Sequence, residues 1–339
     1  MITINKNSKI FIWALDPNVK SGGAAVCNML ASYLNSLGVN AKLFNWGVSL
    51  YEQNDVYKEK YPAIGGSWEE VIDDENTVLI FPEYFFIDIN FEDNGLFKIH
   101  APFIKTHFKH AQIIIWWLST GDDNRHNNIR RTLDAMKFDN VLHMCESHTV
   151  LNDLEHFGIH DVVYLEHGVD SIFYKENANI NKNNYVFYGL KYECQEYVEN
   201  EIIPRINVRR PDIVFKTLKN EYKSPNELCD LYDECKIYID FAYFSGREMM
   251  PREATLRNNI IILNNRNVCT PNFDYPIKSE YKVDRDDPDK ICDLIVDCID
   301  NYDERIKDFT YFKNKCLYEP IMFKSQIYSI FGPAIKKTF

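Results

Sequence analysis

The chain has 339 residues, of which 45% are hydrophobic and 26% charged, and its formal net charge is −12. This length and composition predict a globular protein of two domains, and the negative charge opposes binding to nucleic acid. The sequence shows no apolar run long enough to span a bilayer and no secretory signal pattern within residues 1–9, so we expect a cytoplasmic protein.

The first half of the chain shows alternating strand and helix patterns. An apolar run over 9–15 leads into a turn at Gly22 and Gly23, and a helical pattern over 25–37 follows. Together with an apolar run over 39–46, this predicts a βαβ unit and a parallel sheet. Later elements continue the pattern, with strands expected over 77–81, 112–118, 141–144 and 162–165 and a helix over 147–157.

The second half repeats the same alternation after the asparagine-rich stretch 175–184, which is typical of a linker. Strands are expected over 185–188, 213–216, 237–241 and 260–263, with helices between them. We therefore predict an α/β protein with two doubly wound domains, 1–170 and 171–320. The segment 321–339 is expected to form a helix that packs back on the first domain, with a membrane-surface helix as the alternative.

Nine cysteines are scattered along the chain without a CxxC pair, and their spacing does not suit a zinc site. We expect free thiols, buried as small hydrophobic groups in a reducing compartment.

The segment 244–254 is the most informative stretch for chemistry. Gly246 allows the backbone to approach a ligand, Pro251 suits the first turn of a helix, and that helix start offers N–H groups to an anion. Arg247 carries a forked cation that can grip a diphosphate. Glu253 can accept hydrogen bonds from ribose hydroxyls, or it can be an acid placed to suit the helix dipole. Both interpretations stay open from the residues alone.

The same segment resembles the donor-site signature of retaining glycosyltransferases of family 4, in the bacterial surface-polysaccharide branch with the pattern Gly-Lys-Asp-Arg-x-Pro-Arg-Glu-Ala. The residues that match outright or in charge are Gly246, Arg247, Glu248, Pro251, Arg252, Glu253 and Ala254. Ser245 departs from the pattern, because it stands where the larger family has its first glutamate.

Other segments resemble the same family in the expected order. Pro82-Glu83 and Trp116-Trp117-Leu118 are similar to segments of its first domain, and Gly168-Val169-Asp170 is similar to its interdomain junction. The resemblance implies the glycosyltransferase B fold, with two Rossmann-like domains facing a cleft. The first domain would then receive the acceptor and the second would hold the nucleotide sugar.

The resemblance also implies a reaction: transfer of a sugar from a nucleotide diphosphate sugar to a glycan or lipid-linked acceptor, with retention, without a metal and without a further cofactor. Arg247, Lys191 and Glu253 are the predicted catalytic residues. The predicted substrate-binding residues are Gly22, Gly23, Gly189, Ser245, Gly246, Glu248, Pro251, Arg252 and Asp122.

Several of these residues have a plainer interpretation. Lys191 can be a solvated lysine, Gly22 and Gly23 can form a simple tight turn, and Asp122 with Asp123 invites a metal site. We reject the metal interpretation because no further carboxylate or histidine cluster completes an octahedral shell, and we expect Asp122 to meet acceptor hydroxyls. His167 is interpreted as structural, and the aromatic run 84–86 as core rather than an acceptor platform.

Alternative functions of the same fold are an inverting transferase, a sugar-nucleotide epimerase and a non-catalytic nucleotide-sugar-binding protein. Peripheral contact with the inner face of the membrane and the oligomeric state are left open.

Overall fold

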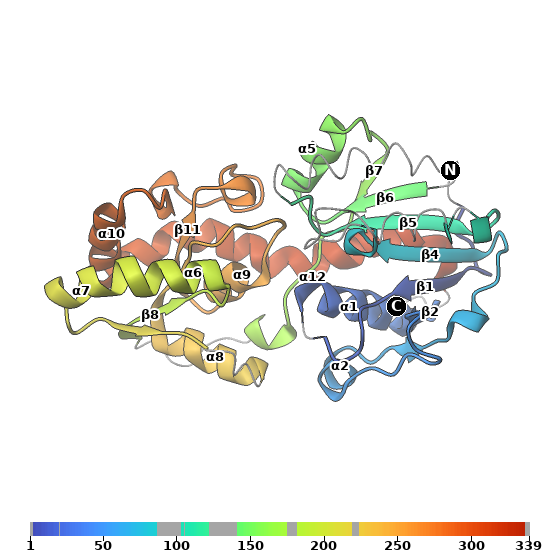
Figure 1. The fold of residues 1–339 in the computed structure, drawn as a ribbon, viewed down its shortest axis with the longest axis horizontal. Helices are drawn as coiled ribbons and strands as arrows, with labels where there is room; N and C mark the ends of the chain where they lie inside the picture. Colours follow the sequence, from blue (N-terminus) through green and yellow to red (C-terminus); the bar gives the residue numbers. More distant parts are fainter. Residues whose placement is uncertain are drawn as a thin grey trace. The chain divides into compact units, whose positions relative to one another are not determined.

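The computed structural model describes residues 3–19, 21–86, 103–104, 106–121, 141–174, 182–218 and 224–335. The chain divides into two compact units (Figure 1). Unit 1 comprises Met1–His167 with Ile321–Phe339, and unit 2 comprises Gly168–Pro320. The sequence led us to expect boundaries after residues 170 and 320, and the segment 175–181 of the expected linker lies outside the described residues.

In the described part of unit 1, seven parallel strands pair in the order β3-β2-β1-β4-β5-β6-β7. Their bounds are β1 (Lys9–Trp13), β2 (Asn40–Phe44), β3 (Ile64–Gly65), β4 (Thr77–Pro82), β5 (Gln112–Trp117), β6 (Val141–Cys145) and β7 (Val162–Tyr164). Every residue of β4 and β5 is buried, as expected for central strands covered on both faces. The helices of this unit include α1 (Gly22–Ser36), α2 (Asp55–Lys60) and α5 (His148–His156).

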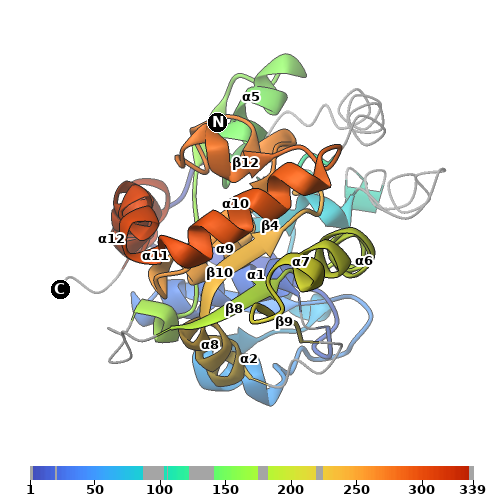
Figure 2. The same ribbon diagram turned by 90° about the vertical axis from the view of Figure 1, so that its left-hand side faces the viewer.

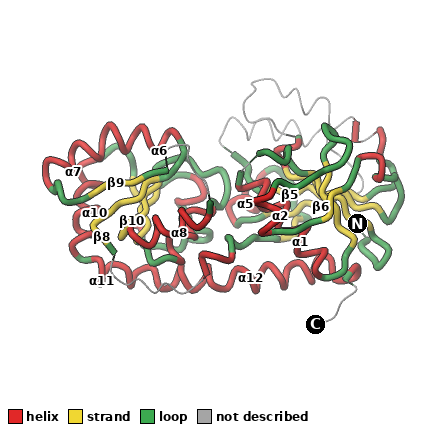
Figure 3. The backbone as a smooth tube through the Cα atoms, turned by 90° about the horizontal axis from the view of Figure 1, so that it is seen from below, coloured by secondary structure: helices red, strands yellow, loops and turns green. Residues whose placement is uncertain are grey.

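In the described part of unit 2, five parallel strands pair in the order β12-β11-β10-β8-β9. Their bounds are β8 (Asn183–Tyr188), β9 (Val214–Lys216), β10 (Cys235–Asp240), β11 (Ile260–Asn264) and β12 (Lys282–Val283). The helices include α6 (Tyr192–Tyr197), α7 (Ile203–Arg209), α8 (Pro225–Glu234), α9 (Met249–Leu256), α10 (Pro288–Asp300), α11 (Tyr302–Arg305) and α12 (Thr310–Phe331). Helices lie on both sides of strands β8 and β10 (Figures 2 and 3). The prediction of two Rossmann-like, doubly wound domains is confirmed.

Local sequence explains where α1 begins and where its chain turns. The Ser21 side chain accepts a hydrogen bond from the Ala24 N–H and so caps the helix. Gly38, with φ of 76°, turns the chain into β2 in a backbone conformation that glycine adopts without strain. The capping serine and this glycine thus mark the two ends of α1.

The end of α12 belongs to unit 1. Phe323, Ile327 and Phe331 are buried, and the Phe323 ring lies 5.7 Å from the ring of Tyr33 in α1. The apolar side predicted from the sequence therefore packs against the first unit. Among the described residues, no helix has both the length and the apolar character needed to cross a bilayer.

The nine cysteines all fall within the described ranges, where each is buried and none forms a disulfide. The prediction of free buried thiols is confirmed.

Candidate functional site

The loop between β10 and α9, together with α9 itself, carries most of the predicted donor-site residues, all within unit 2. Gly246 and Arg247 are buried, whereas Ser245 is partly exposed. Two asparagines, one at the end of β11 and one just after it, donate hydrogen bonds to carbonyl groups of this loop. Asn264 Nδ2 donates to the Phe241 carbonyl at 2.9 Å, and Asn267 Nδ2 donates to the Phe244 carbonyl at 2.8 Å. The loop conformation is therefore fixed by side-chain bonds to its carbonyls.

A buried cluster of charges ties this loop to α12. Arg247, Arg252 and Glu319 are 3%, 0% and 2% exposed. The Glu319 carboxylate accepts from both guanidinium groups, from Arg247 through one oxygen and from Arg252 at 2.9 Å through the other. Arg247 is thus engaged with a carboxylate inside the protein, and its predicted grip on a diphosphate stays a prediction.

Arg252 also closes the turn that precedes α9. Its Nε donates to the Glu248 carbonyl and its Nη2 donates to the Arg247 carbonyl, both at 3.1 Å. These contacts satisfy backbone acceptors of the turn, and the predicted contact of Arg252 with a substrate stays a prediction. The sequence does not single out Glu319, which lies next to Pro320 within α12 and belongs to no recognisable pattern.

Lys191 and Glu248 meet beside the loop. Lys191 is the residue before α6 and its side chain is 44% exposed. Its ammonium group bonds to the Glu248 carboxylate, donates to the Tyr243 carbonyl at 3.2 Å and lies 5.2 Å from the centre of the Phe244 ring. The structure therefore brings together three predicted segments, 189–191, 243–248 and the start of α9.

Gly189 and Asp240 lie side by side at the ends of β8 and β10, because Tyr188 pairs with Ile239. A Cβ atom on Gly189 would lie 2.4 Å from Asp240 Oδ2, so this position requires glycine. Asp240 is 4% exposed, and its carboxylate accepts from Tyr238 Oη at 2.7 Å and from the Ala242 N–H at 3.0 Å. Burial raises the pKa of this carboxyl above its usual value.

Asp240 was not among the predicted site residues. An acid that ends an otherwise apolar strand is the signal that could have found it.

Glu253 and Pro251 lie in the first two turns of α9. The helix begins at Met249, so Pro251 falls where the backbone donor has no partner within the helix. Glu253 is 6% exposed, and its carboxylate oxygen lies 3.2 Å from Tyr232 Oη. A bond to a core tyrosine is compatible with either interpretation of Glu253, so its contact with ribose stays a prediction.

The two glycines at the start of α1 have different surroundings. A Cβ on Gly22 would meet nothing within 4 Å, whereas one on Gly23 would lie 2.8 Å from Tyr84 Cε1. Tyr84 also contacts Cys27 Sγ through its hydroxyl at 3.6 Å. Gly23 is therefore needed for packing, and Gly22 borders open space.

The aromatic run 84–86 was expected to belong to the core. Phe85 and Phe86 are each 1% exposed, which confirms that this run belongs largely to the core.

The remaining predicted residue, Asp122, lies outside the described residues, as does Asp123. Among the described residues, no group of three or more histidine, cysteine, aspartate or glutamate side chains is arranged to hold a metal ion.

Unit 1 has its own buried polar residues at the carboxyl ends of its strands. The Glu83 carboxylate accepts from the Leu118 N–H and from Ser119 Oγ, both at 2.9 Å. His167 Nε2 lies 2.6 Å from Glu146 Oε2, and both side chains are buried. His167 is thus buried against a carboxylate, and the structural role expected for it stays a prediction.

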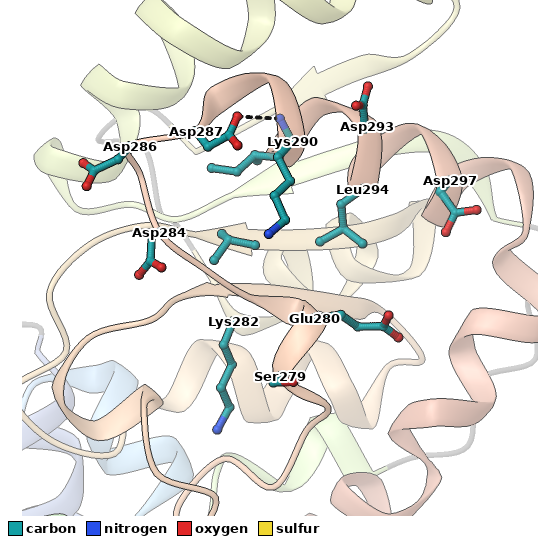
Figure 4. A pocket seen from close by; sticks show the side chains of 12 residues that line it. Ser279, Glu280, Lys282, Asp284, Asp286, Asp287, Lys290, Asp293, Leu294 and Asp297 are labelled. Carbon is teal, nitrogen blue, oxygen red and sulfur yellow. Dashed lines mark hydrogen bonds between the residues drawn. The ribbon is translucent and has the colours of Figure 1, made fainter.

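A cavity of about 710 Å³ lies elsewhere in unit 2, beside β12 and α10 (Figure 4). Its lining is strongly acidic, but Arg305 pairs with Glu280 and Asp297, and Arg209 pairs with Asp293. These ion pairs neutralise part of the lining. The cavity contains none of the predicted site residues, so it is not the candidate site.

No protein-family model matches this chain, and no curated relative matches its sequence. Solved structures do match. HepE of Anabaena, in complex with UDP and glucose, superposes with a TM-score of 0.62 and 10% identity over 96% of this chain and 99% of that chain. Sucrose-phosphate synthase of Thermosynechococcus elongatus gives the same TM-score and identity over 96% of this chain and 100% of that chain.

TarM of S. aureus, in complex with UDP among other ligands, superposes with a TM-score of 0.56 and 11% identity over 79% of this chain. The match spans 57% of that longer chain. At these identities the similarity shows the fold, which is the glycosyltransferase B fold with two Rossmann-like domains. The prediction of that fold is confirmed.

The glycine pair of α1 gives a first prediction. Gly23→Ala should lower the free energy of unfolding by about 1–3 kcal/mol, because the added methyl group collides with the Tyr84 ring. Gly22→Ala is the matched control and should leave stability unchanged or slightly raised. Urea unfolding of both variants measures the difference, and equal stabilities would contradict the described packing of Tyr84.

The Arg252 cluster gives a second prediction. Arg252→Ala should cost about 3–5 kcal/mol of stability, because it removes a buried partner of Glu319 and two donors to backbone carbonyls. Arg209→Ala is the control, since that arginine pairs with acids at an exposed surface and should cost about 1 kcal/mol or less. Thermal or urea unfolding measures both variants, and an equal loss of stability in Arg252→Ala and Arg209→Ala would argue against the buried cluster.

Glu83 gives a prediction about pH. Burial raises the pKa of its carboxyl from 4.5 to about 7, against the lowering effect of its bonds to Leu118 and Ser119. The folded state therefore holds this proton more tightly than the unfolded state, and the associated stability is complete below about pH 4.5 and lost as the pH rises through about 7.

Glu83→Gln removes that dependence. Between pH 5 and pH 8, the free energy of unfolding of the variant should gain about 2–3 kcal/mol relative to the wild type. Urea unfolding at both pH values measures the change, with Glu155→Gln on the surface of α5 as a control that should follow the wild type. A difference that does not vary with pH would show that Glu83 titrates normally.

Proposed function

We propose that this protein is a glycosyltransferase that moves a sugar from a nucleotide diphosphate sugar to a hydroxyl group of a glycan or lipid-linked acceptor. One observation carries the proposal. The ends of β8 and β10 bring Gly189, Lys191, Glu248 and the start of α9 together in a domain of the glycosyltransferase B fold. Carboxyl ends of parallel strands are where such folds bind nucleotides.

Lys191 and the start of α9 both suit a diphosphate. Lys191 supplies a partly exposed ammonium group, and the first turn of α9 supplies backbone N–H groups with the favourable end of a helix dipole. Because the Lys191 ammonium bonds to Glu248, an incoming phosphate oxygen would compete with or join that carboxylate. Arg247 would add a second cation if it exchanged Glu319 for phosphate.

The chemistry follows from those groups. During transfer, the bond between the anomeric carbon and the phosphate oxygen breaks, and its electron pair stays on the diphosphate. The acceptor oxygen forms the new bond to the anomeric carbon, and the proton of that hydroxyl is released to the diphosphate or to water. Cations and N–H dipoles that are already in place stabilise that growing charge, so the proposed reaction needs no metal ion. Retention of the anomeric configuration, together with a ribose contact from Glu253, is the finer part of the proposal and rests on the resemblance of residues 244–254.

The solved relatives suggest which donor to test first. The HepE and TarM structures contain UDP, so a uridine diphosphate sugar is the proposed donor class. A non-catalytic binding protein is the second candidate, favoured by Ser245 in place of the family glutamate and by the pairing of Arg247 with Glu319. Product analysis decides among the remaining functions, because an epimerase converts the donor without an acceptor and an inverting enzyme changes the anomer.

The donor site is tested by ligand-induced stabilisation. UDP and UDP-glucose should raise the melting temperature of the wild type in a concentration-dependent manner. Lys191→Ala should weaken their apparent affinity about tenfold or more, because a charge-assisted bond to phosphate is lost. Its melting temperature without ligand should stay close to that of the wild type, since the side chain is 44% exposed.

Lys278→Ala provides the matched control in the same unit. Lys278 is also an exposed lysine in an ion pair, with Asp308 at 2.7 Å, and its replacement should leave nucleotide affinity unchanged. Equal affinities of the Lys191 and Lys278 variants for UDP would refute the donor site.

A further inference from the structure

Polar residues follow four neighbouring strands at the carboxyl edge of the unit 1 sheet. Glu83 comes after β4, Ser119 after β5, Glu146 after β6, and His167 after β7. These strands are adjacent in the order β4-β5-β6-β7. Parallel pairing therefore places the four side chains in a row along one edge.

Neighbouring members of this row contact each other in two pairs, Glu83 with Ser119 and Glu146 with His167. Ser119 Oγ donates to Glu83 Oε1 at 2.9 Å, while the Leu118 N–H donates to the other carboxylate oxygen. At the far end, His167 Nε2 lies 2.6 Å from Glu146. Glu83 is 6% exposed, whereas Ser119 is partly exposed. The serine is thus the member of the first pair that solvent reaches, and the acid stands behind it.

The charges around Glu83 come from several elements. Glu146 raises the pKa of the Glu83 carboxyl beyond the effect of burial, and His167 faces Glu146 from the next strand end. From α1, Cys27 approaches, and burial raises the pKa of its thiol to about 12, so it is neutral at ordinary pH. Tyr84, whose pKa is raised well above its usual value, is also neutral. Burial thus shifts the pKa of Glu83 to about 7, while the neighbouring thiol and phenol stay neutral at that pH.

We propose that Ser119 binds the attacking hydroxyl of the acceptor and that Glu83 is the positioning residue that orients the serine. This inference rests on the proposed function and adds a residue pair for its acceptor side. When Glu83 is ionised, it takes the proton of Ser119 in a hydrogen bond, which leaves the serine oxygen lone pairs to accept from a substrate hydroxyl. The hydroxyl group of the acceptor then donates its proton in a hydrogen bond to the Ser119 oxygen. The lone pairs of the acceptor oxygen point away from the serine.

Ionisation of Glu83 sets the pH range of this arrangement. A protonated Glu83 no longer requires the serine as a donor, so the orientation of the Ser119 hydroxyl is lost. Transfer at low acceptor concentration should therefore rise as the pH increases through about 7 in the wild type. A purely structural role for Glu83 would not give a pH-dependent effect on the acceptor step alone.

Thiol labelling tests the exposure of position 119 without any assay of activity. All nine native cysteines are buried, so the wild type should react slowly with 5,5′-dithiobis(2-nitrobenzoic acid). Ser119→Cys should react readily, and Ser36→Cys, at an exposed position of α1, provides the positive control. An introduced thiol at position 119 that stays as unreactive as the native thiols would overturn the proposal.

The same variant tests the contact with Glu83. A neighbouring carboxylate disfavours the thiolate, so adding Glu83→Gln to Ser119→Cys should speed labelling at pH 8 by roughly threefold to tenfold. Adding Glu155→Gln instead should have no effect. Equal rates with and without Glu83 would show that the two side chains do not interact.

Activity then separates the acceptor step from donor binding. With UDP-glucose and a panel of p-nitrophenyl glycosides, Glu83→Gln and Ser119→Ala should lower kcat/KM for the acceptor about tenfold to a hundredfold and abolish its rise through pH 7. UDP should stabilise both variants as it does the wild type. An unchanged pH profile in Glu83→Gln, or loss of UDP stabilisation in Ser119→Ala, would refute the assignment. Failure of UDP to stabilise the wild type would instead count against the proposed function.

Discussion

Parallel strand pairing brings the carboxyl ends of neighbouring strands to one edge of each sheet, and buried polar side chains of this protein collect at those edges. In unit 1 the edge carries Glu83, Ser119 and Glu146, and in unit 2 it carries Asp240 and the loop that leads to Arg247. Burial of such groups is costly unless each is hydrogen-bonded. The described contacts of Glu83 and Asp240 meet that requirement by using backbone N–H groups and neighbouring hydroxyls.

The Arg247, Arg252 and Glu319 cluster changes how the loop before α9 is understood. From sequence, both arginines belong to a signature for binding a donor. In the structure, Arg252 bonds to backbone carbonyls and to Glu319, and these bonds shape the turn. Lys191 is the more accessible cation of this region. A signature residue can thus be required because it builds the loop, while a lysine contributed by another strand end is proposed to bind the phosphate.

The fold could largely be predicted from sequence, because long buried strands leave clear apolar runs. Each strand expected from the sequence matches an observed strand to within two residues at each end. The two-residue strands β3 and β12 were missed, since two residues carry no periodicity. The first domain was expected to end after residue 170, and the division between the units falls between His167 and Gly168.

The candidate site was predicted less completely, for a physical reason. Gly189, Lys191 and the residues of 244–253 stand next to strong local patterns, and the structure brings these segments together. Glu319 is distant in sequence from its arginine partners and lies within a helix, so only the folded chain reveals the pair. Ser119 and Glu83 are likewise joined through the order of strands, which a single sequence does not specify.

The two sheet edges differ in charge in a way that suits two halves of one reaction. At the unit 2 edge, the Lys191 ammonium group, which bonds to Glu248, lies beside the start of α9, and a cation and a helix N-terminus favour a leaving group that gains negative charge. At the unit 1 edge, a serine backed by a carboxylate suits a neutral hydroxyl, whose oxygen gains reactivity when its proton is held in a hydrogen bond. An anionic edge would repel a diphosphate, and a cationic edge would draw electron density away from a nucleophile. Under the proposed function, the partly exposed lysine at the unit 2 edge therefore suits the donor, and the serine and carboxylate pair at the unit 1 edge suits the acceptor hydroxyl.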